Sequence, residues 1–557
     1  LYTAEIIDKE TYDLALTEPL PTEPHPIPQL APHLLAYASK TLEGHRITTS
    51  LPIDLQQKVS QIVAGYYSHY SQSEIYNMAA LVVEVKTRKV LAYVGNTPTD
   101  ENHQKDVDII HAPRSTGSVL KPFLYAAMLH EGELLPTTLI PDVPTQIAGY
   151  SPQNFSNSFE GAVPADMALA KSLNVPFVWL LRQFTTYRFY EVLQKLRLKN
   201  ISRHPDHYGL SIILGGAESN LWDLAQAYTN LASEVNVFAA TQQYRTAEFQ
   251  SLSYIAGNSP DFGKATTALP TLRAGALYSM FSAMKEVNRP TDDVAWRYYE
   301  SARKIAWKTG TSFGNKDAWA IGATPEYVVA VWVGNATGEG RPTLTGVSYA
   351  APVMFSIFNA LPRTTWFQQP LDDMREVTIC EQSGYLAKPE CPQKLLRTTL
   401  APKEIGQCPY HKLVHLTPEG QYQVNASCQP VDQIYTKAWF VLPPVMEWYY
   451  KQQHVHYQSL PPFRSDCTEG VAQKALDFVY PKHLSVIYTT KSFGGEQQPF
   501  VAKAANRSGK LFWYIDDVYL GTTDTFHEMN IFAAKGEHLL KIINEKGDEK
   551  TIKVICQ

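Results

Sequence analysis

Cysteine is absent from this 557-residue chain before Cys380, and long apolar runs are absent throughout. No run approaches the ~20 apolar residues that a helix needs to cross a bilayer, and no signal peptide is visible. Charge is nearly balanced at a net −5, without blocks of Lys and Arg among aromatics, which argues against nucleic acid as a partner. Because the chain begins at Leu1, we expect a piece of a longer protein whose membrane anchor lies upstream.

The six cysteines all fall in the last third of the chain, at Cys380, Cys391, Cys408, Cys428, Cys467 and Cys556. An even number confined to one region favours disulfides and an oxidising compartment. Zinc is the alternative, because Cys408 and His411 stand close together with Cys391 upstream, but paired Cys-x-x-Cys knuckles are lacking. We therefore favour disulfides over zinc, and we expect no cofactor and no catalytic metal.

Changes in composition divide the chain into five parts, in keeping with two to four domains at ~150 residues each. In the first part, Asp8 can cap a short helix that ends before Pro19. A proline-rich linker, a mixed α/β domain, a connector rich in cysteine and proline, and a run of short strands follow. The predicted limits are 1–20, 21–48, 49–362, 363–470 and 471–557.

Local patterns predict several elements within these parts. Asp54 to Gln57 has the form of a capping box that opens an amphipathic helix. Two β-rich runs, 79–85 and 90–94, flank a charged turn and indicate a hairpin, and 327–333 is strand-like. Short strands near the C-terminus, such as 510–515 and 538–543, are typical of a small β-sandwich.

Three short motifs carry the chemistry. They are Ser118-Val119-Leu120-Lys121, Ser172-Leu173-Asn174 and Lys308-Thr309-Gly310-Thr311. Each alone is common on helix surfaces, at turns or at strand ends, and a second Ser-x-x-Lys at Ser301 is interpreted as accidental. Together, in this order, they form the signature of penicillin-recognising serine acyltransferases.

The residue types suit that chemistry, since a serine hydroxyl attacks poorly until a base removes its proton. Lys121, placed one helical turn after Ser118, can be that base if burial and a second cation, Lys308, lower its pKa. Lys308 can also attract a substrate carboxylate. Ser172 can relay a proton to the leaving amine, and Asn174 can hydrogen-bond the substrate amide.

The end of the third motif is suited to holding the reacting carbonyl. Gly310 allows close approach of the substrate backbone. The amides of Ser118 and Thr311 then form an oxyanion hole, typically worth ~3 kcal/mol per donor. Glu218 and Asp317 lie near the motifs in the sequence, and we interpret both as structural, in a cap or a salt bridge.

Over nearly its whole length the chain resembles class A penicillin-binding proteins, specifically the 1C subtype. The resemblance is carried by segments 117–123, 170–176, 214–218, 308–312, 317–319, 332–335 and 350–352. It implies an α/β (α+β) transpeptidase fold, with a central antiparallel sheet flanked by helices, plus a C-terminal all-β sandwich. Residues 1–20 resemble the last helix of a glycosyltransferase domain whose catalytic glutamates are not in this sequence.

The resemblance also implies a reaction. Ser118 would be acylated by the D-Ala-D-Ala end of a peptidoglycan stem peptide, and an amine of a neighbouring stem would then form the crosslink. Thr309 and Thr311 match positions that hold the terminal carboxylate, and β-lactams would trap the same serine. The implied partners are stem peptides, glycan strands, β-lactams and other cell-wall synthesis proteins. The implied location is the periplasmic side of the bacterial inner membrane, with membrane contact only through the N-terminal anchor.

Two other functions remain open, and one is disfavoured. A D,D-carboxypeptidase uses the same motifs with water in place of the acceptor amine. A non-catalytic scaffold or β-lactam receptor would use the β-sandwich for docking, with Trp513 and Tyr514 as candidate surface aromatics, although one of two adjacent strand residues faces the core. A β-lactamase is disfavoured, because no Glu-x-x-x-Asn stands between the second and third motifs.

Overall fold

The computed structural model describes residues 1–557 except 20–28, 41, 146–150, 248, 258–259, 288–302, 404, 468–475, 490–496, 507–508, 525 and 546. Most of the proline-rich part of the predicted linker, and Ser301 of the second Ser-x-x-Lys, therefore lie outside the described residues. Among the helices that are described, none combines the length and the apolar character needed to span a membrane.

The N-terminal helices confirm one predicted cap and correct another. Helix α1 (Lys9–Thr17) begins after Asp8, whose carboxylate accepts the backbone N–H of Thr11 at 2.7 Å. Helix α2 spans Pro32–Ser39, and α3 spans Ile53–Tyr70. The predicted capping box at Asp54 is wrong, because α3 begins directly after Pro52 and Asp54 already lies in its first turn. Its carboxylate is still favourable there, near the positive end of the helix dipole.

The centre of the molecule is a five-stranded antiparallel sheet in the order β2-β1-β11-β10-β9. Its strands are β1 (Asn77–Glu84), β2 (Val90–Val94), β9 (Ala306–Thr311), β10 (Asp317–Ala323) and β11 (Tyr327–Gly334). The predicted hairpin and the strand near 327–333 are therefore confirmed. Alternate residues of β1 enter two different cores, with Leu81 in one and Val82 in the other. Both faces of the sheet are thus buried, which explains the unbroken apolar runs.

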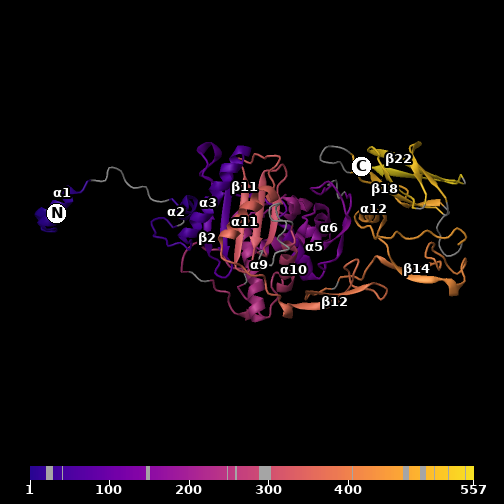
Figure 1. Cartoon of the computed structure of the whole chain (residues 1–557), viewed down its shortest axis with the longest axis horizontal. Helices are drawn as coiled ribbons and strands as arrows, with labels where there is room; N and C mark the ends of the chain where they lie inside the picture. The colour runs from indigo at the N-terminus through magenta and orange to yellow at the C-terminus, as the bar shows by residue number, and fades with distance from the viewer. Residues whose placement is uncertain are drawn as a thin grey trace.

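Helices cover both faces of this sheet (Figure 1). Residues of α3 and of α11 (Ala351–Ala360) pack in the core on one face. The other core is built by α4 (Lys121–Glu131), α6 (Asn174–Phe184), α9 (Leu221–Thr241) and α10 (Ala274–Lys285). The three sequence motifs all contact this second group of helices or begin them.

The connector consists of two β-hairpins and a helix. Strand β12 (Met374–Cys380) pairs with β13 (Gln393–Thr399), and β14 (His411–Leu416) pairs with β15 (Tyr435–Phe440). Helix α12 (Pro444–Gln453) follows and contacts both β5 (Gly161–Pro164) of the first domain and β18 (Phe500–Asn506) of the C-terminal domain. Figure 1 shows α12 next to β18.

The C-terminal domain is a β-sandwich, as predicted. One sheet has the order β16-β18-β21 and the other the order β17-β23-β22-β19-β20. The strands are β16 (Leu476–Tyr480), β17 (Ser485–Ile487), β18 (Phe500–Asn506), β19 (Leu511–Ile515), β20 (Val518–Thr523), β21 (Glu528–Ile531), β22 (Gly536–Asn544) and β23 (Glu549–Cys556). Side chains from both sheets form a single apolar core between them.

The disulfide prediction is confirmed for one pair and wrong for the other four cysteines. Cys428 and Cys467 form a disulfide. The remaining cysteines, Cys380, Cys391, Cys408 and Cys556, are free and buried. Cys556 lies alone in the sandwich core, while the other three gather beside His411 and do not pair.

The two candidate aromatics of the sandwich have opposite surroundings. Trp513 is fully buried, 6.0 Å from the ring of Phe478 between ring centroids, and its indole N–H donates to the hydroxyl of Thr523 at 2.8 Å. Tyr514 lies on the other face of β19 and is only partly buried. Trp513 is therefore a core residue and not a docking aromatic.

We expect Trp513→Ala to destabilise the C-terminal domain by about 3–5 kcal/mol, because it removes a large buried side chain and leaves a cavity. Differential scanning calorimetry of the whole chain should show the sandwich transition at a clearly lower temperature. Tyr514→Ala is the matched control and should cost much less. Equal shifts for the two variants would contradict this account of the core.

Candidate active site

The first motif lies in a turn that leads into α4. The backbone N–H of Val119 donates to Thr116 O at 3.2 Å, and that of Lys121 donates to Ser118 O at 3.3 Å. Ser118 is half-buried and precedes the helix, whose first residue is Lys121. The expectation that both residues lie within the helix is therefore wrong. The turn nevertheless places Lys121 next to Ser118, because the backbone N–H of Lys121 bonds to the carbonyl of Ser118.

Lys121 connects the first motif to the second. Its amine is fully buried and donates to Ser172 O at 2.8 Å, to Leu173 O at 3.0 Å and to Asn174 Oδ1 at 2.7 Å. Burial, and then the nearby charge of Lys308, lower the pKa of Lys121 well below its ordinary value. A lysine held in this way gives up its proton more readily than an ordinary lysine and can act as a base.

The second motif bends sharply to present its groups to both lysines. Ser172 has a φ of 56°, in the left-handed region that a serine rarely adopts. Such a conformation costs on the order of 1 kcal/mol or more and persists only when surrounding contacts hold it. Here the carbonyl of Ser172 accepts from Lys121, and its hydroxyl accepts from Lys308 Nζ at 2.7 Å.

Asn154 positions the second motif, and sequence reasoning missed it. Its Oδ1 accepts the backbone N–H groups of Asn174 at 2.9 Å and Val175 at 3.2 Å, at the start of α6. Its Nδ2 donates to Asp142 at 2.7 Å. No spacing rule connects position 154 to the Ser-x-Asn motif, so only the fold could identify it. The side-chain amide of Asn174 itself donates to Gln153 O at 2.7 Å.

The third motif occupies β9, where Lys308 is almost completely buried. Its amine donates to the Ser172 hydroxyl and to Thr309 O at 2.8 Å, and burial lowers the pKa of Lys308 to about 7. The hydroxyl of Thr311 accepts the backbone N–H of Gly346 at 3.0 Å. Thr309 is 9% exposed.

The end of β9 lies directly against the turn that carries Ser118. A Cβ atom added at Gly310 would meet Thr116 O at 2.6 Å, and one added at Gly117 would meet the backbone nitrogen of Thr311 at 2.7 Å. Only glycine at both positions allows this contact. The structure therefore brings all three predicted motifs together at one place.

Two acidic residues near the motifs have separate surroundings. The buried carboxylate of Asp317 accepts the indole N–H of Trp332 at 3.0 Å, and its pKa is raised by burial. This agrees with a structural role: the hydrogen-bond donor is an indole, and the positive charge of Arg114 also acts on the carboxylate. Glu218 is exposed, in the short β6 (Glu218–Ser219), which pairs with β3 (Arg114–Ser115).

Comparison with known sequence families assigns the two main domains. The penicillin binding protein transpeptidase domain matches residues 78–359, which is half of the chain. The Penicillin-Binding Protein C-terminus Family matches residues 466–554. The chain therefore belongs to the penicillin-binding protein family, and it carries a transpeptidase domain, an acyltransferase of bacterial cell-wall synthesis.

Individual relatives agree with this assignment and with the expected class A resemblance. The chain is 27% identical to penicillin-binding protein 1C of Escherichia coli over 97% of its own length and 69% of that protein. It is 26% identical to penicillin-binding protein 1B of Vibrio cholerae over 56% of its length, but it spans only 40% of that relative. The crystal structure of penicillin-binding protein 1A from Haemophilus influenzae has the same fold, with a TM-score of 0.53, 15% identity, and coverage of 73% of this chain and 81% of that one.

We expect the stability of the transpeptidase domain to rise with pH above about 7, because of Lys308. An unfolded chain holds the lysine proton up to an ordinary pKa of 10.5, whereas the folded domain releases it near 7. Between these values the unfolded state binds more protons, so each pH unit adds up to ~1.4 kcal/mol to the free energy of unfolding. Urea midpoints of the domain transition at pH 7 and pH 9 measure this slope.

Lys308→Met should reduce the slope without abolishing it, because the pKa of Lys121 is shifted in the same direction. The matched control is Lys316→Met, at an exposed lysine in the turn between β9 and β10. An unchanged slope in Lys308→Met would contradict a lowered pKa for the buried amine of Lys308.

Proposed function

We propose that this chain is a serine-type D,D-transpeptidase that crosslinks peptidoglycan stem peptides. The observation that supports the proposal best is the convergence of two buried amines on one residue. Lys121 Nζ donates to the carbonyl of Ser172, and Lys308 Nζ donates to its hydroxyl. A proton network of this kind, next to a serine on a tight turn, suits acyl transfer.

In the acylation step Ser118 Oγ attacks the carbonyl of the penultimate D-alanine while Lys121 takes the hydroxyl proton. A neutral amine has two N–H groups and one lone pair, so one of the three acceptors of Lys121 loses its donor when the lysine is the base. The low pKa of Lys121 makes that neutral state accessible. The backbone amides of Ser118 and Thr311 stabilise the oxyanion.

The leaving D-alanine amine receives its proton through Ser172, whose hydroxyl is bonded to Lys308. The terminal carboxylate of the donor is held by the hydroxyls of Thr309 and Thr311, with Lys308 as the nearby charge. Asn174 hydrogen-bonds the substrate amide. An amine of a neighbouring stem then attacks the acyl-enzyme, restores Ser118 and forms the crosslink. A β-lactam acylates the same serine, but the amine released from its carbonyl stays attached to the acyl group and keeps the acceptor amine away.

The setting of the reaction belongs to the same proposal. The Cys428–Cys467 disulfide suits an oxidising compartment, in keeping with the periplasmic side of the inner membrane. Relatives such as penicillin-binding protein 1C extend beyond this chain, which spans 69% of that protein. For the full-length protein we propose a further glycosyltransferase domain and a membrane anchor. Glycan strands and other cell-wall synthesis proteins are the further partners.

We expect covalent labelling by a fluorescent penicillin to disappear in Ser118→Ala, because the attacking oxygen is lost. Ser301→Ala, in the second Ser-x-x-Lys, is the matched control and should label like the unaltered chain. Gel fluorescence and intact mass measure the outcome. Labelling that persists in Ser118→Ala, or its absence in the unaltered chain, would refute the proposal.

Product analysis separates transpeptidation from the carboxypeptidase and scaffold alternatives. With a pentapeptide donor and an acceptor stem, we expect a crosslinked dimer and free D-alanine, both lost in Ser118→Ala. Mass spectrometry of the products distinguishes the cases. Tetrapeptide without dimer, even at high acceptor concentration, would indicate a D,D-carboxypeptidase. Penicillin labelling without either product would indicate a β-lactam-binding scaffold.

A further inference from the structure

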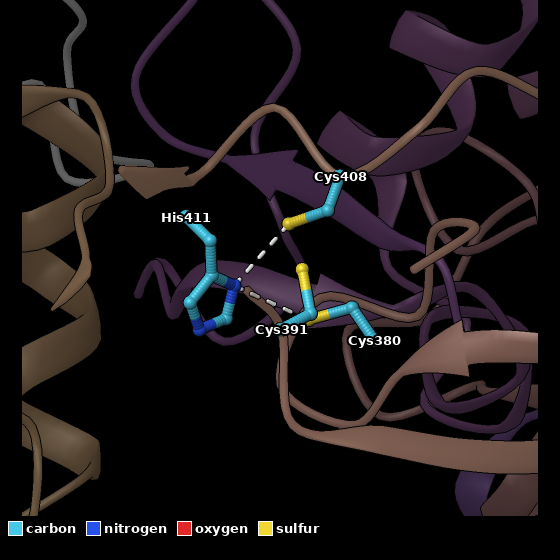
Figure 2. A group of neighbouring side chains, drawn as sticks. All are labelled: Cys380, Cys391, Cys408 and His411. Atoms are coloured by element: carbon cyan, nitrogen blue, oxygen red, sulfur yellow. Dashed lines mark hydrogen bonds between the residues drawn. The ribbon is translucent and has the colours of Figure 1, made fainter. Parts of the chain in front are cut away.

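Four side chains with strong affinity for metals meet in the connector, away from the acyl-transfer motifs. Cys380 ends β12, Cys391 lies two residues before β13, Cys408 lies three residues before β14, and His411 is the first residue of β14. All four are buried, and their ligand atoms lie within 4.8 Å of one another. Figure 2 shows the sulfur atoms and the imidazole turned toward a common space between the two hairpins.

The spacing of these atoms fits a tetrahedral zinc ion. The Nδ1 atom of His411 lies 3.4 Å from the sulfur of Cys380 and 3.4 Å from that of Cys408 (Figure 2). Zn–S bonds of ~2.3 Å and Zn–N bonds of ~2.0 Å at tetrahedral angles separate sulfur from nitrogen by ~3.5 Å. These two nitrogen–sulfur distances are therefore already close to the edge length of such a tetrahedron, and the remaining donor atoms lie within 4.8 Å of one another.

The donor set itself selects the kind of ion. Three thiolates and one imidazole form a closed set of four ligands, which is typical of structural zinc sites and leaves no position for a substrate. No carboxylate or carbonyl oxygen is among the four, which disfavours magnesium and calcium. Disulfides cannot satisfy all three sulfurs, because three is an odd number. The neighbouring Cys428 and Cys467 do pair, so the connector contains both disulfide-bonded and free cysteines.

Groups around the cluster hold the sulfurs in place. The hydroxyl of Ser383 donates to Cys408 Sγ at 3.2 Å, and the backbone N–H of Lys388 donates to Cys391 Sγ at 3.4 Å. Hydrogen bonds to ligand sulfurs are the usual outer shell of metal–thiolate sites. The second group of possible ligands, Cys428, Cys467 and Asp466, lacks this character because its two sulfurs are bonded to each other.

We propose that Cys380, Cys391, Cys408 and His411 bind one structural Zn²⁺ ion. Binding forms three Zn–S bonds and one Zn–N bond, and it releases the three thiol protons to solvent. The ion would hold the β12–β13 and β14–β15 hairpins together where neither has a large core of its own.

The same site would fix the connector to the transpeptidase domain. The backbone N–H of Leu139, in β4 (Leu139–Asp142), donates to Ser383 O at 2.9 Å, and Leu139 and Ala162 pack in one core with the three cysteines. Strand β4 ends at Asp142, which binds Asn154, the residue that positions Asn174. The zinc ion is therefore a positioning element connected to the second motif through one strand, and not a catalytic group.

The first test is the metal content of the whole chain, purified without chelators or metal-affinity tags and measured by inductively coupled plasma mass spectrometry. We expect about one zinc per chain, falling at least tenfold in Cys391→Ser. Cys556→Ser is the matched control, since Cys556 is also free and buried but lies in the sandwich core, and it should keep its zinc. Iron in place of zinc, or equal zinc in Cys391→Ser, would overturn the assignment.

The main outcome of a second test comes from the unaltered chain and so does not depend on how well a variant folds. Zinc is removed from the unaltered chain under reducing conditions and replaced by Co²⁺, which gives thiolate charge-transfer and tetrahedral ligand-field absorption in a Cys₃His site. Ser383→Ala should weaken Co²⁺ binding about tenfold through the loss of its hydrogen bond to Cys408. The proposal fails if no such spectrum appears, or if non-reducing peptide mapping finds a disulfide among Cys380, Cys391 and Cys408.

Discussion

The buried amine of Lys121 is the group on which the arrangement of this active site depends. A polar amine with no exposure to water must find hydrogen-bond partners inside the protein, because an unpaired one would cost several kcal/mol. All three of its acceptors come from Ser172, Leu173 and Asn174. Satisfying one side chain therefore fixes the second motif against the first. It also stabilises the left-handed backbone of Ser172, which in turn directs the serine hydroxyl toward Lys308.

The position of β9 in the sheet determines how a substrate can reach these groups. In the part of the chain that the structure describes, β9 is the last strand of the order β2-β1-β11-β10-β9. An edge strand presents backbone donors and acceptors on its outer side, to which an extended peptide can add. The close contact between Gly117 and Thr311 places the Ser118 turn at the same edge. In the proposed reaction, binding along the strand and attack by the serine would thus occur at one place.

The connector and α12 join the transpeptidase domain to the C-terminal domain. Helix α12 lies between β5 and β18, and Glu447 on this helix pairs with Lys503 at 2.6 Å, while Lys503 also pairs with Glu528 at 2.8 Å. These ion pairs are largely buried, so each charge needs its partner and the geometry between helix and sandwich is restricted. The three cysteines beside His411 lie nearer the start of the connector and pack against β4 and β5.

Local sequence patterns predicted the strands and hairpins that several neighbouring residues encode together. The apolar runs of β1 and β11, the hairpin between β1 and β2, and the short strands of the sandwich were predictable because neighbouring residues encode them. Local patterns failed where a boundary depended on one residue. Helix α3 begins at Ile53, directly after Pro52 and before the expected cap at Asp54, and α4 begins at Lys121 and not at Ser118. Counting cysteines failed as well, because an even number is compatible with a pair, a cluster or a solitary buried thiol.

The sequence by itself determined the three motifs and their order, and it therefore predicts which residues carry the chemistry. Only the tertiary structure decided what those residues touch. Asn154 holds Asn174 across 20 positions, and Cys380 meets His411 across 31. Such contacts depend on the path of the backbone between the partners, which no local spacing records. Motifs were therefore readable in advance, whereas the groups that position them, and the cysteine cluster, emerged only when distant segments were packed together.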